Sequence, residues 1–188
     1  MNLSDQNQLF ILTGAPGVGK TSLLAELAKF AFQTVPEPAR IILARQRAIN
    51  GPALPEKNPM LFCEAMLTGS IEDYNRNQNS QQPVIFDRGI PDNIAYAGCF
   101  DLDTTHFIQE SKKYYFNKTV FLLTPWKEIY ATDDERKMNF DQVCEFHKLF
   151  CKAYLDLKYN LVEVPRASTV ERAIFVRKIV DSHKISKL

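Results

Sequence analysis

The chain has 188 residues, of which 45% are hydrophobic and 24% are charged, as in an ordinary globular domain with a sizeable core. Lys and Arg number 23 against 22 Asp and Glu, which leaves a formal net charge of +1. This balance gives no reason to expect nucleic acid or an anionic membrane as a partner. We also expect no membrane span, because no apolar run approaches the roughly 20 residues that a span requires.

The first residues and the cysteines bear on the cellular compartment. Residues 1–8 are polar and lack the apolar stretch of a signal peptide, so we expect a cytoplasmic protein. The four cysteines are Cys63, Cys99, Cys144 and Cys151. None of them belongs to a C-x-x-C pair of the kind common in redox and zinc sites, so we expect buried free thiols. The sequence leaves open whether the chain is a monomer or a homodimer.

Short apolar segments alternate with segments of helical periodicity along the chain. The expected strands are Leu9–Thr13, Gln33–Pro36, Val84–Asp87, Thr119–Thr124 and Leu161–Val164. Strands that are apolar on both faces and separated by helices predict an α/β fold with a parallel sheet covered on both sides. Ligands of such sheets lie beyond the carboxyl ends of the strands.

The expected helices are Ser22–Lys29, Arg40–Asn50, one that starts at Asn58-Pro59, a short one opened by Pro91, Thr104–Tyr114, a long one from Phe140, and Thr169–Lys184. Asn58 before Pro59 is a typical helix start. Asp103 suits the cap of the helix Thr104–Tyr114. The long helix is predicted to bury Val143, Cys144, His147, Phe150, Cys151, Tyr154 and Leu155. No linker or repeat interrupts the pattern, which predicts a single domain over residues 1–188.

Residues 14–21 match the P-loop pattern G-x-x-x-x-G-K-[ST] in every constrained position and lie between a predicted strand and a predicted helix. The glycines allow the backbone to approach phosphate closely. Lys20 supplies a positive charge to the β- and γ-phosphates, and the Thr21 hydroxyl is a ligand for Mg²⁺. The predicted nucleotide-binding residues are Gly14, Ala15, Pro16, Gly17, Val18, Gly19, Lys20, Thr21, Ser22 and Arg136.

Asp87 and the residue after it distinguish between classes of P-loop protein. Asp87 ends an apolar strand, where a carboxylate reaches the Mg²⁺ of a P-loop; the alternative is a helix cap or an ion pair. ATP-hydrolysing P-loop proteins generally have a Glu directly after this Asp, and that Glu polarises water. In this chain Arg88 follows instead. A cation at this position suits an acceptor substrate or a phosphate. The N-K-x-D motif, with which molecular switches recognise guanine, is incomplete here, because no aspartate stands two positions after Asn117-Lys118.

Two further charged residues are candidates for the reaction. Glu37 stands between Pro36 and Pro38 at the end of the second strand, where a carboxylate takes the proton from an attacking hydroxyl. Residues 126–139 are predicted to form a small lid, from which Arg136 closes onto the phosphates and excludes water. The alternatives are an exposed loop glutamate and a solvated charged face.

Several segments resemble those of known kinases. Residues 35–40 resemble the E-P segment of deoxynucleoside kinases, and residues 85–89 resemble the D/E-R segment of those enzymes and of thymidylate kinase. The whole chain is similar to a family of P-loop ATPases and kinases, the AAA-type ATPase domain family, which is related to ribosylnicotinamide kinase domains. Further marks of that family are residues 87–92, 125–130, 134–136 and 164–166.

The resemblance implies a three-layer α/β/α P-loop fold with a five-stranded parallel sheet of nucleotide-kinase type, ATP and Mg²⁺. It suggests Glu37 as the base, Asp87 for the metal, Arg88 for the acceptor and Arg136 as the lid cation. The chain departs from many nucleoside kinases because its lid has one D-x-E-R arginine where they carry two.

We therefore predict a P-loop kinase that transfers the γ-phosphoryl of ATP·Mg to a small-molecule, nucleoside- or nucleotide-like acceptor. The acceptor group is a hydroxyl or a phosphate, between which the sequence does not decide. The expected catalytic residues are Lys20, Glu37, Asp87, Arg88 and Arg136, with Thr21 and Asp87 at the metal. The alternative is an ATP- or GTP-binding regulatory module, or a slow NTPase, that acts through a protein or lipid partner.

Overall fold

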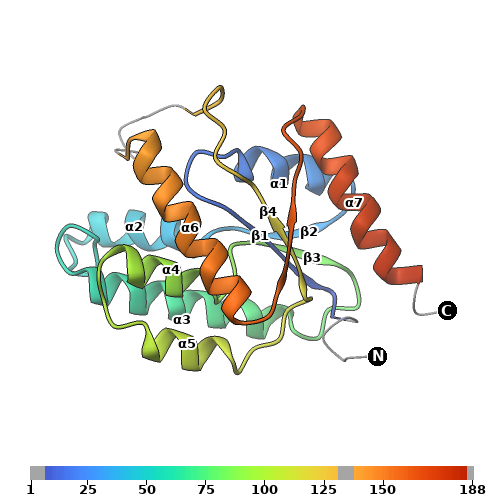
Figure 1. Cartoon of the computed structure of the whole chain (residues 1–188). Helices are drawn as coiled ribbons and strands as arrows, with labels where there is room; N and C mark the ends of the chain where they lie inside the picture. Colours follow the sequence, from blue (N-terminus) through green and yellow to red (C-terminus); the bar gives the residue numbers. More distant parts are fainter. Residues whose placement is uncertain (1–6, 131–137, 186–188) are drawn as a thin grey trace.

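Five strands form one parallel sheet at the centre of the computed structural model, which describes residues 7–130 and 138–185 (Figure 1). The strands are β1 (Leu9–Thr13), β2 (Gln33–Val35), β3 (Val84–Asp87), β4 (Thr119–Leu122) and β5 (Asn160–Glu163). Their order across the sheet is β2-β3-β1-β4-β5, and every neighbouring pair is parallel. The predicted α/β fold with a parallel sheet is confirmed.

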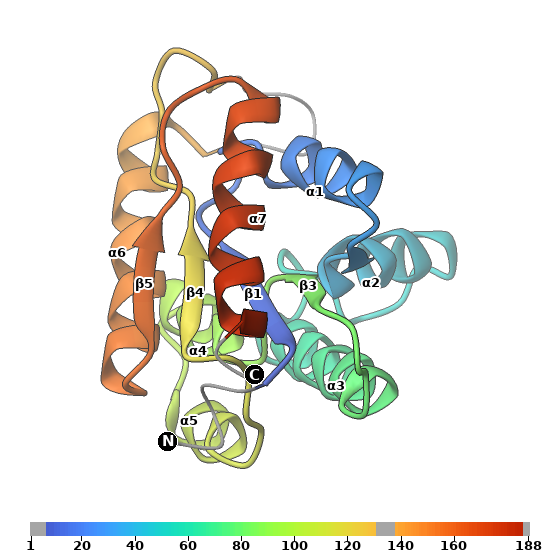
Figure 2. The ribbon, with the colours of Figure 1, turned by 90° about the vertical axis from the view of Figure 1, so that its right-hand side faces the viewer.

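Helices cover both faces of this sheet. They are α1 (Lys20–Lys29), α2 (Pro38–Ala48), α3 (Pro59–Asn77), α4 (Asp92–Cys99), α5 (Thr105–Ser111), α6 (Phe140–Asp156) and α7 (Thr169–Ile185). One core cluster joins α1 and α7 to the sheet, and a second joins it to α2, α3, α4, α5 and α6. Figure 2 shows α6 and α7 on opposite sides of β4 and β5. None of these helices, within the part of the chain that the structure describes, is long and apolar enough to cross a bilayer.

Local sequence signals account for the helix starts. The Asn58 side chain accepts a hydrogen bond from the Leu61 amide at 3.1 Å, and Pro59 occupies the first turn of α3, as predicted. At α5, Asp103 Oδ1 accepts from the Thr105 amide at 2.9 Å. The predicted start of α3 is confirmed, whereas α5 begins at Thr105 with Thr104 as its cap residue and ends earlier than the periodicity suggested. Helices α1 and α2 each begin two residues earlier than predicted.

The buried face of α6 differs from the prediction at several positions. Cys144, His147 and Cys151 are only half-buried. Leu155 is 53% exposed, whereas its neighbour Tyr154 is fully buried. Successive helical residues point about 100° apart, so Leu155 lies about 200° around the helix from the buried Ala153 and faces solvent. Phe146 and Ala153 complete the buried face instead, and the predicted burial of Leu155 is wrong.

The strand order places the candidate chemistry at one edge of the sheet. The segment after β1 lies between the carboxyl ends of β3 and β4, because β1 pairs with both strands. The register aligns Leu12 with Asp87, so β1 and β3 end side by side. Parallel strands of this type leave a ligand site at their carboxyl ends.

Candidate active site

The segment between β1 and α1 adopts a backbone that needs glycine. Gly14 has φ 142°, and a Cβ built there would lie 2.3 Å from the carbonyl oxygen of Leu123. Gly19 has φ 87° immediately before α1, a left-handed conformation that favours glycine. The aromatic ring of Tyr130 lies against Gly17, where a Cβ would come within 2.7 Å of it. This close-packed turn leads into a helix N-terminus, as a phosphate site requires.

Lys20 lies inside this turn, with only 6% of its surface exposed. Its ammonium donates hydrogen bonds to the carbonyl oxygens of Gly14 at 3.0 Å and Ala15 at 3.2 Å. Burial, reinforced by the nearby charge of Arg88, lowers the pKa of Lys20 to about 8. A polyphosphate bound in the turn would supply the negative charge that this ammonium lacks.

Binding of ATP·Mg is expected to take up a proton on Lys20. The pKa of the free side chain is about 8, and an adjacent phosphate anion raises it, so binding draws protons from solvent. Uptake should reach roughly half a proton per ATP near pH 8 and disappear below about pH 7, where Lys20 is already charged. Calorimetry at pH 8 in two buffers of different ionisation enthalpy measures this uptake. Identical heats in both buffers would contradict the lowered pKa.

Thr21 and Asp87 are the residues predicted to hold a metal ion. Thr21 and Ser22 are exposed at the start of α1, while Asp87 ends the neighbouring strand β3. Asp87 Oδ1 is buried and has no hydrogen-bond partner among the described residues, and burial raises the pKa of Asp87. A buried oxygen without a partner fits a Mg²⁺ site, because Mg²⁺ binds one or two protein oxygens together with phosphate and water.

Arg88 joins the P-loop to the ends of β2 and β3. Its Nε donates to Glu37 Oε1 at 2.6 Å, and its Nη1 donates to the Gly14 carbonyl at 3.0 Å and to Asp92 Oδ1 at 3.2 Å. The side chain is 5% exposed. Burial disfavours its charge, but Glu37 and the neighbouring Tyr96, Asp92 and Asp87 together outweigh that effect and hold the pKa of Arg88 well above its usual value. Arg88 also has φ 72°, a strained conformation for a residue with a Cβ.

Glu37 stands at the start of α2 as its N-terminal flanking residue. The Tyr96 hydroxyl donates to Glu37 Oε1 at 3.0 Å, the same oxygen that Arg88 contacts. Burial would raise the pKa of Glu37, but the charges of Arg88 and Lys20 outweigh it and lower the pKa to about 2. Glu37 is therefore a paired, half-buried carboxylate and not the freely exposed loop glutamate of the alternative interpretation.

Asp92 is a second buried carboxylate that the sequence motifs did not single out. It accepts hydrogen bonds from the Thr13 hydroxyl at 2.5 Å and from the Gly89 amide at 2.7 Å. The Tyr154 hydroxyl of α6 donates to it as well. With Arg88, these bonds connect β1, the turn after β3 and α6 in one network.

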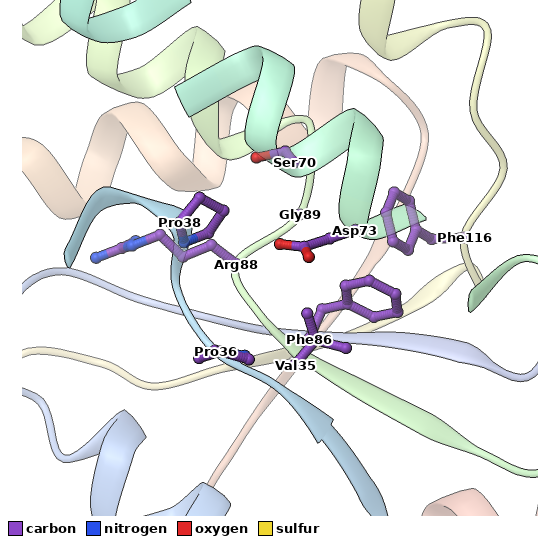
Figure 3. Close-up of a pocket in the computed structure, with 9 residues that line it drawn as sticks. All are labelled: Val35, Pro36, Pro38, Ser70, Asp73, Phe86, Arg88, Gly89 and Phe116. Carbon is purple, nitrogen blue, oxygen red and sulfur yellow. The ribbon is translucent and has the colours of Figure 1, made fainter. Parts of the chain in front are cut away.

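Two adjoining pockets open beside this network, each of about 200 Å³ including space open to solvent. The first lies between α3 and the ends of β2 and β3 (Figure 3). The second is lined by Glu37, Pro38, Ala39, Met66, Ser70, Arg88, Gly89, Asp92, Asn93 and Tyr96. We call the second one the Glu37 pocket. It opens onto the carboxylate of Glu37 beside the P-loop.

A further arginine, Arg172 of α7, contacts the backbone of the P-loop. It is 5% exposed, and its Nη2 donates to the Val18 carbonyl at 3.1 Å. Because the peptide unit is planar and trans, the Gly19 N–H points opposite to the Val18 carbonyl. The contact that orients this carbonyl therefore also orients the Gly19 N–H. No motif marks Arg172, which reaches the loop across 154 positions of sequence.

The structure thus brings Lys20, Glu37, Asp87 and Arg88 to one end of the sheet. The sequence-based prediction of their proximity agrees with the strand order, while their individual roles stay predictions. The predicted lid cation, Arg136, lies outside the described residues.

Comparison with known proteins gives a family and a fold. A family model described as an AAA domain matches residues 9–172. No curated protein matches the chain at a significant level.

Solved structures with the same fold include several kinases. A NadR protein in complex with NR is 20% identical, with a TM-score of 0.72 over 95% of this chain and 53% of that chain. This chain thus spans about half the length of that protein. Thymidylate kinase from Candida albicans is 14% identical, with a TM-score of 0.63 over 95% and 92% of the two chains. Shikimate kinase from Acinetobacter baumannii in complex with shikimate is 14% identical, with a TM-score of 0.62 over 96% of each chain.

Proposed function

The chain belongs to the AAA domain family, and we propose that it is an ATP-dependent phosphotransferase with a small-molecule acceptor. One observation carries this proposal. Glu37, a carboxylate beside the P-loop, borders a pocket that opens to solvent and is held there by Arg88 at 2.6 Å. A pocket of this kind offers an acceptor a place next to the nucleotide. A machine that only hydrolyses ATP needs a base for water at this point instead.

Each predicted residue has a role in the proposal. Lys20 and the P-loop bind the ATP phosphates, and Lys20 stabilises charge on the transferred group. Thr21 and Asp87 would hold Mg²⁺, which would supply positive charge to neutralise the phosphate oxygens. Glu37 accepts a hydrogen bond from the acceptor, and Arg136 remains a proposed lid cation.

The low pKa of Glu37 refines its role. A carboxylate with a pKa of about 2 is ionised at neutral pH but is a weak base. Phosphoryl transfer passes through a loose transition state that depends mainly on positioning and charge. Glu37 therefore orients the acceptor and receives its proton late.

The structural neighbours fit this proposal without naming the acceptor. Those structures are a thymidylate kinase, a shikimate kinase and a NadR protein in complex with NR. Thymidylate, shikimate and NR are chemically diverse small molecules. We further propose that the enzyme acts in the cytoplasm, where ATP·Mg is available.

An acceptor screen tests the proposal. The purified chain, γ-labelled ATP and Mg²⁺ are incubated with a library of nucleosides, nucleotides, sugars and small hydroxy acids. We expect label in one acceptor class and only slow label release to water. Hydrolysis that responds to no small acceptor, but increases with a protein or lipid vesicles, would instead support the regulatory alternative.

A further inference from the structure

We propose that the acceptor of this chain presents an uncharged hydroxyl group to Glu37, and that phosphate monoesters are rejected. This inference rests on the proposed phosphotransferase function and names the class of its substrate. It follows from the charges that line the Glu37 pocket and from the bonds that Arg88 already makes.

Carboxylates dominate the charge around the Glu37 pocket. Glu37 and Asp92 line it, and Arg88 is the only cation among its described lining residues. The adjoining pocket adds the carboxylate of Asp73 (Figure 3). In that view the guanidinium of Arg88 extends away from Asp73 and toward Pro38. A phosphate dianion entering this space would meet an ionised carboxylate, Glu37, with a pKa of about 2.

Arg88 has little capacity left for an acceptor phosphate. Its Nε and Nη1 donate to Glu37, to the Gly14 carbonyl and to Asp92. The rings of Tyr96 and Phe150 lie over its guanidinium, with centroids at 5.2 and 4.8 Å. Only Nη2 donates to none of the residues that the structure describes. Phosphate recognition by arginine uses two parallel N–H donors, and Arg88 cannot present such a pair.

Arg40 is another described cation close to the P-loop, and it contacts the start of α1. Its Nη2 donates to Thr21 Oγ1 at 3.3 Å, and its side chain is exposed. It does not line the Glu37 pocket. Arg40 therefore adds positive charge next to the residues that bind ATP·Mg and not next to the acceptor.

Glu37 is well suited to a hydroxyl donor. Both of its described hydrogen bonds, from Arg88 and Tyr96, end on Oε1, which leaves Oε2 to accept from a substrate. In the reaction, the acceptor oxygen forms a bond to the γ-phosphorus while the bond to the β,γ-bridging oxygen breaks. ADP leaves with the electron pair of that bond. The hydroxyl proton passes to Glu37 Oε2 and from there to water.

Matched pairs of acceptors test the inference. Nucleosides and simple sugars, each paired with its own monophosphate, are assayed with labelled ATP·Mg and the full chain. We expect kcat/KM for the best hydroxyl compound to exceed that of its monophosphate by about 100-fold or more, since like charges repel in the pocket. In Glu37→Gln this ratio should fall at least about tenfold, because the repelling charge is gone. Glu72→Gln, on the exposed side of α3, is the control and should preserve it.

The outcomes separate the two levels of the proposal. Monophosphates that are labelled as fast as their hydroxyl partners, or faster, would overturn the inference while the phosphotransferase function stands. An unchanged ratio in Glu37→Gln would overturn the electrostatic cause assigned to Glu37. If no acceptor of either kind is labelled although ATP·Mg binds, the proposed function itself fails, and the inference falls with it.

Discussion

Lys20→Ala and Lys20→Met are expected to lower phosphoryl transfer by roughly 10³-fold or more, without lowering the stability of the fold. The first effect arises because the Lys20 ammonium stabilises charge on the transferred phosphoryl group. The second arises because the ammonium is buried at 6% exposure and its pKa falls from 10.5 to about 8. Such a shift corresponds to about 3 kcal/mol of unfavourable free energy in the folded protein at neutral pH.

The stability effect has a definite sign and a control. The folded state binds the Lys20 proton more weakly than the unfolded state, so this side chain destabilises the fold below pH 8, and the cost disappears as pH rises toward 10.5. The bonds from Lys20 to the Gly14 and Ala15 carbonyls offset part of the cost. Lys20→Met should therefore raise the free energy of unfolding by about 1 kcal/mol.

Urea unfolding and single-turnover transfer, measured on the same preparation, check both effects. Lys29→Met at the exposed end of α1, where Lys29 pairs with Glu26 at 2.7 Å, should change neither quantity much. A Lys20→Met protein that is clearly less stable than the wild type would show that Lys20 holds the loop together, and would remove the evidence for its electrostatic role.

The sequence predicts the parts of this site that depend on local pattern. The P-loop follows from its spacing, and β3 follows from an apolar run that ends at Asp87. Their proximity follows from the rule that parallel strands end at the same edge of a sheet. The same rule correctly placed Glu37, although β2 is a short edge strand.

The partners of these residues could not be predicted, because they come from distant elements. Asp92 and Tyr154 are 62 residues apart, and Arg172 and Val18 are 154 apart. Asp92 reads from the sequence as an ordinary first-turn acid of α4, and Arg172 as a surface arginine of α7. Only the packing of α6 and α7 against the sheet shows that both are buried. The pKa of Glu37 likewise depends on Arg88, 51 residues away.

Arg88→Met should cause the largest loss of stability in this site, about 3–5 kcal/mol, because it leaves Glu37 and Asp92 as buried carboxylates without their cation. Without Arg88, burial dominates and the pKa of Glu37 rises from about 2 to above its ordinary value. The wild type loses stability from Glu37 as pH falls from about 4.5 toward 2. The loss in Arg88→Met, by contrast, should shrink toward pH 4, as protonation removes the unpaired charge.

A double-mutant cycle with Glu37→Gln measures the interaction energy between Glu37 and Arg88. If the 2.6 Å ion pair dominates, the double variant Glu37→Gln/Arg88→Met should be less destabilised than the sum of the two single variants, by about 1–3 kcal/mol. Arg88→Lys should recover only part of the stability, since an ammonium cannot contact Glu37, Asp92 and the Gly14 carbonyl together as the planar guanidinium does. Additive losses would mean that Arg88 acts through Asp92 and the P-loop and not through Glu37. In that case Glu37 would be free to titrate in the ordinary carboxylate range and to serve as a conventional base.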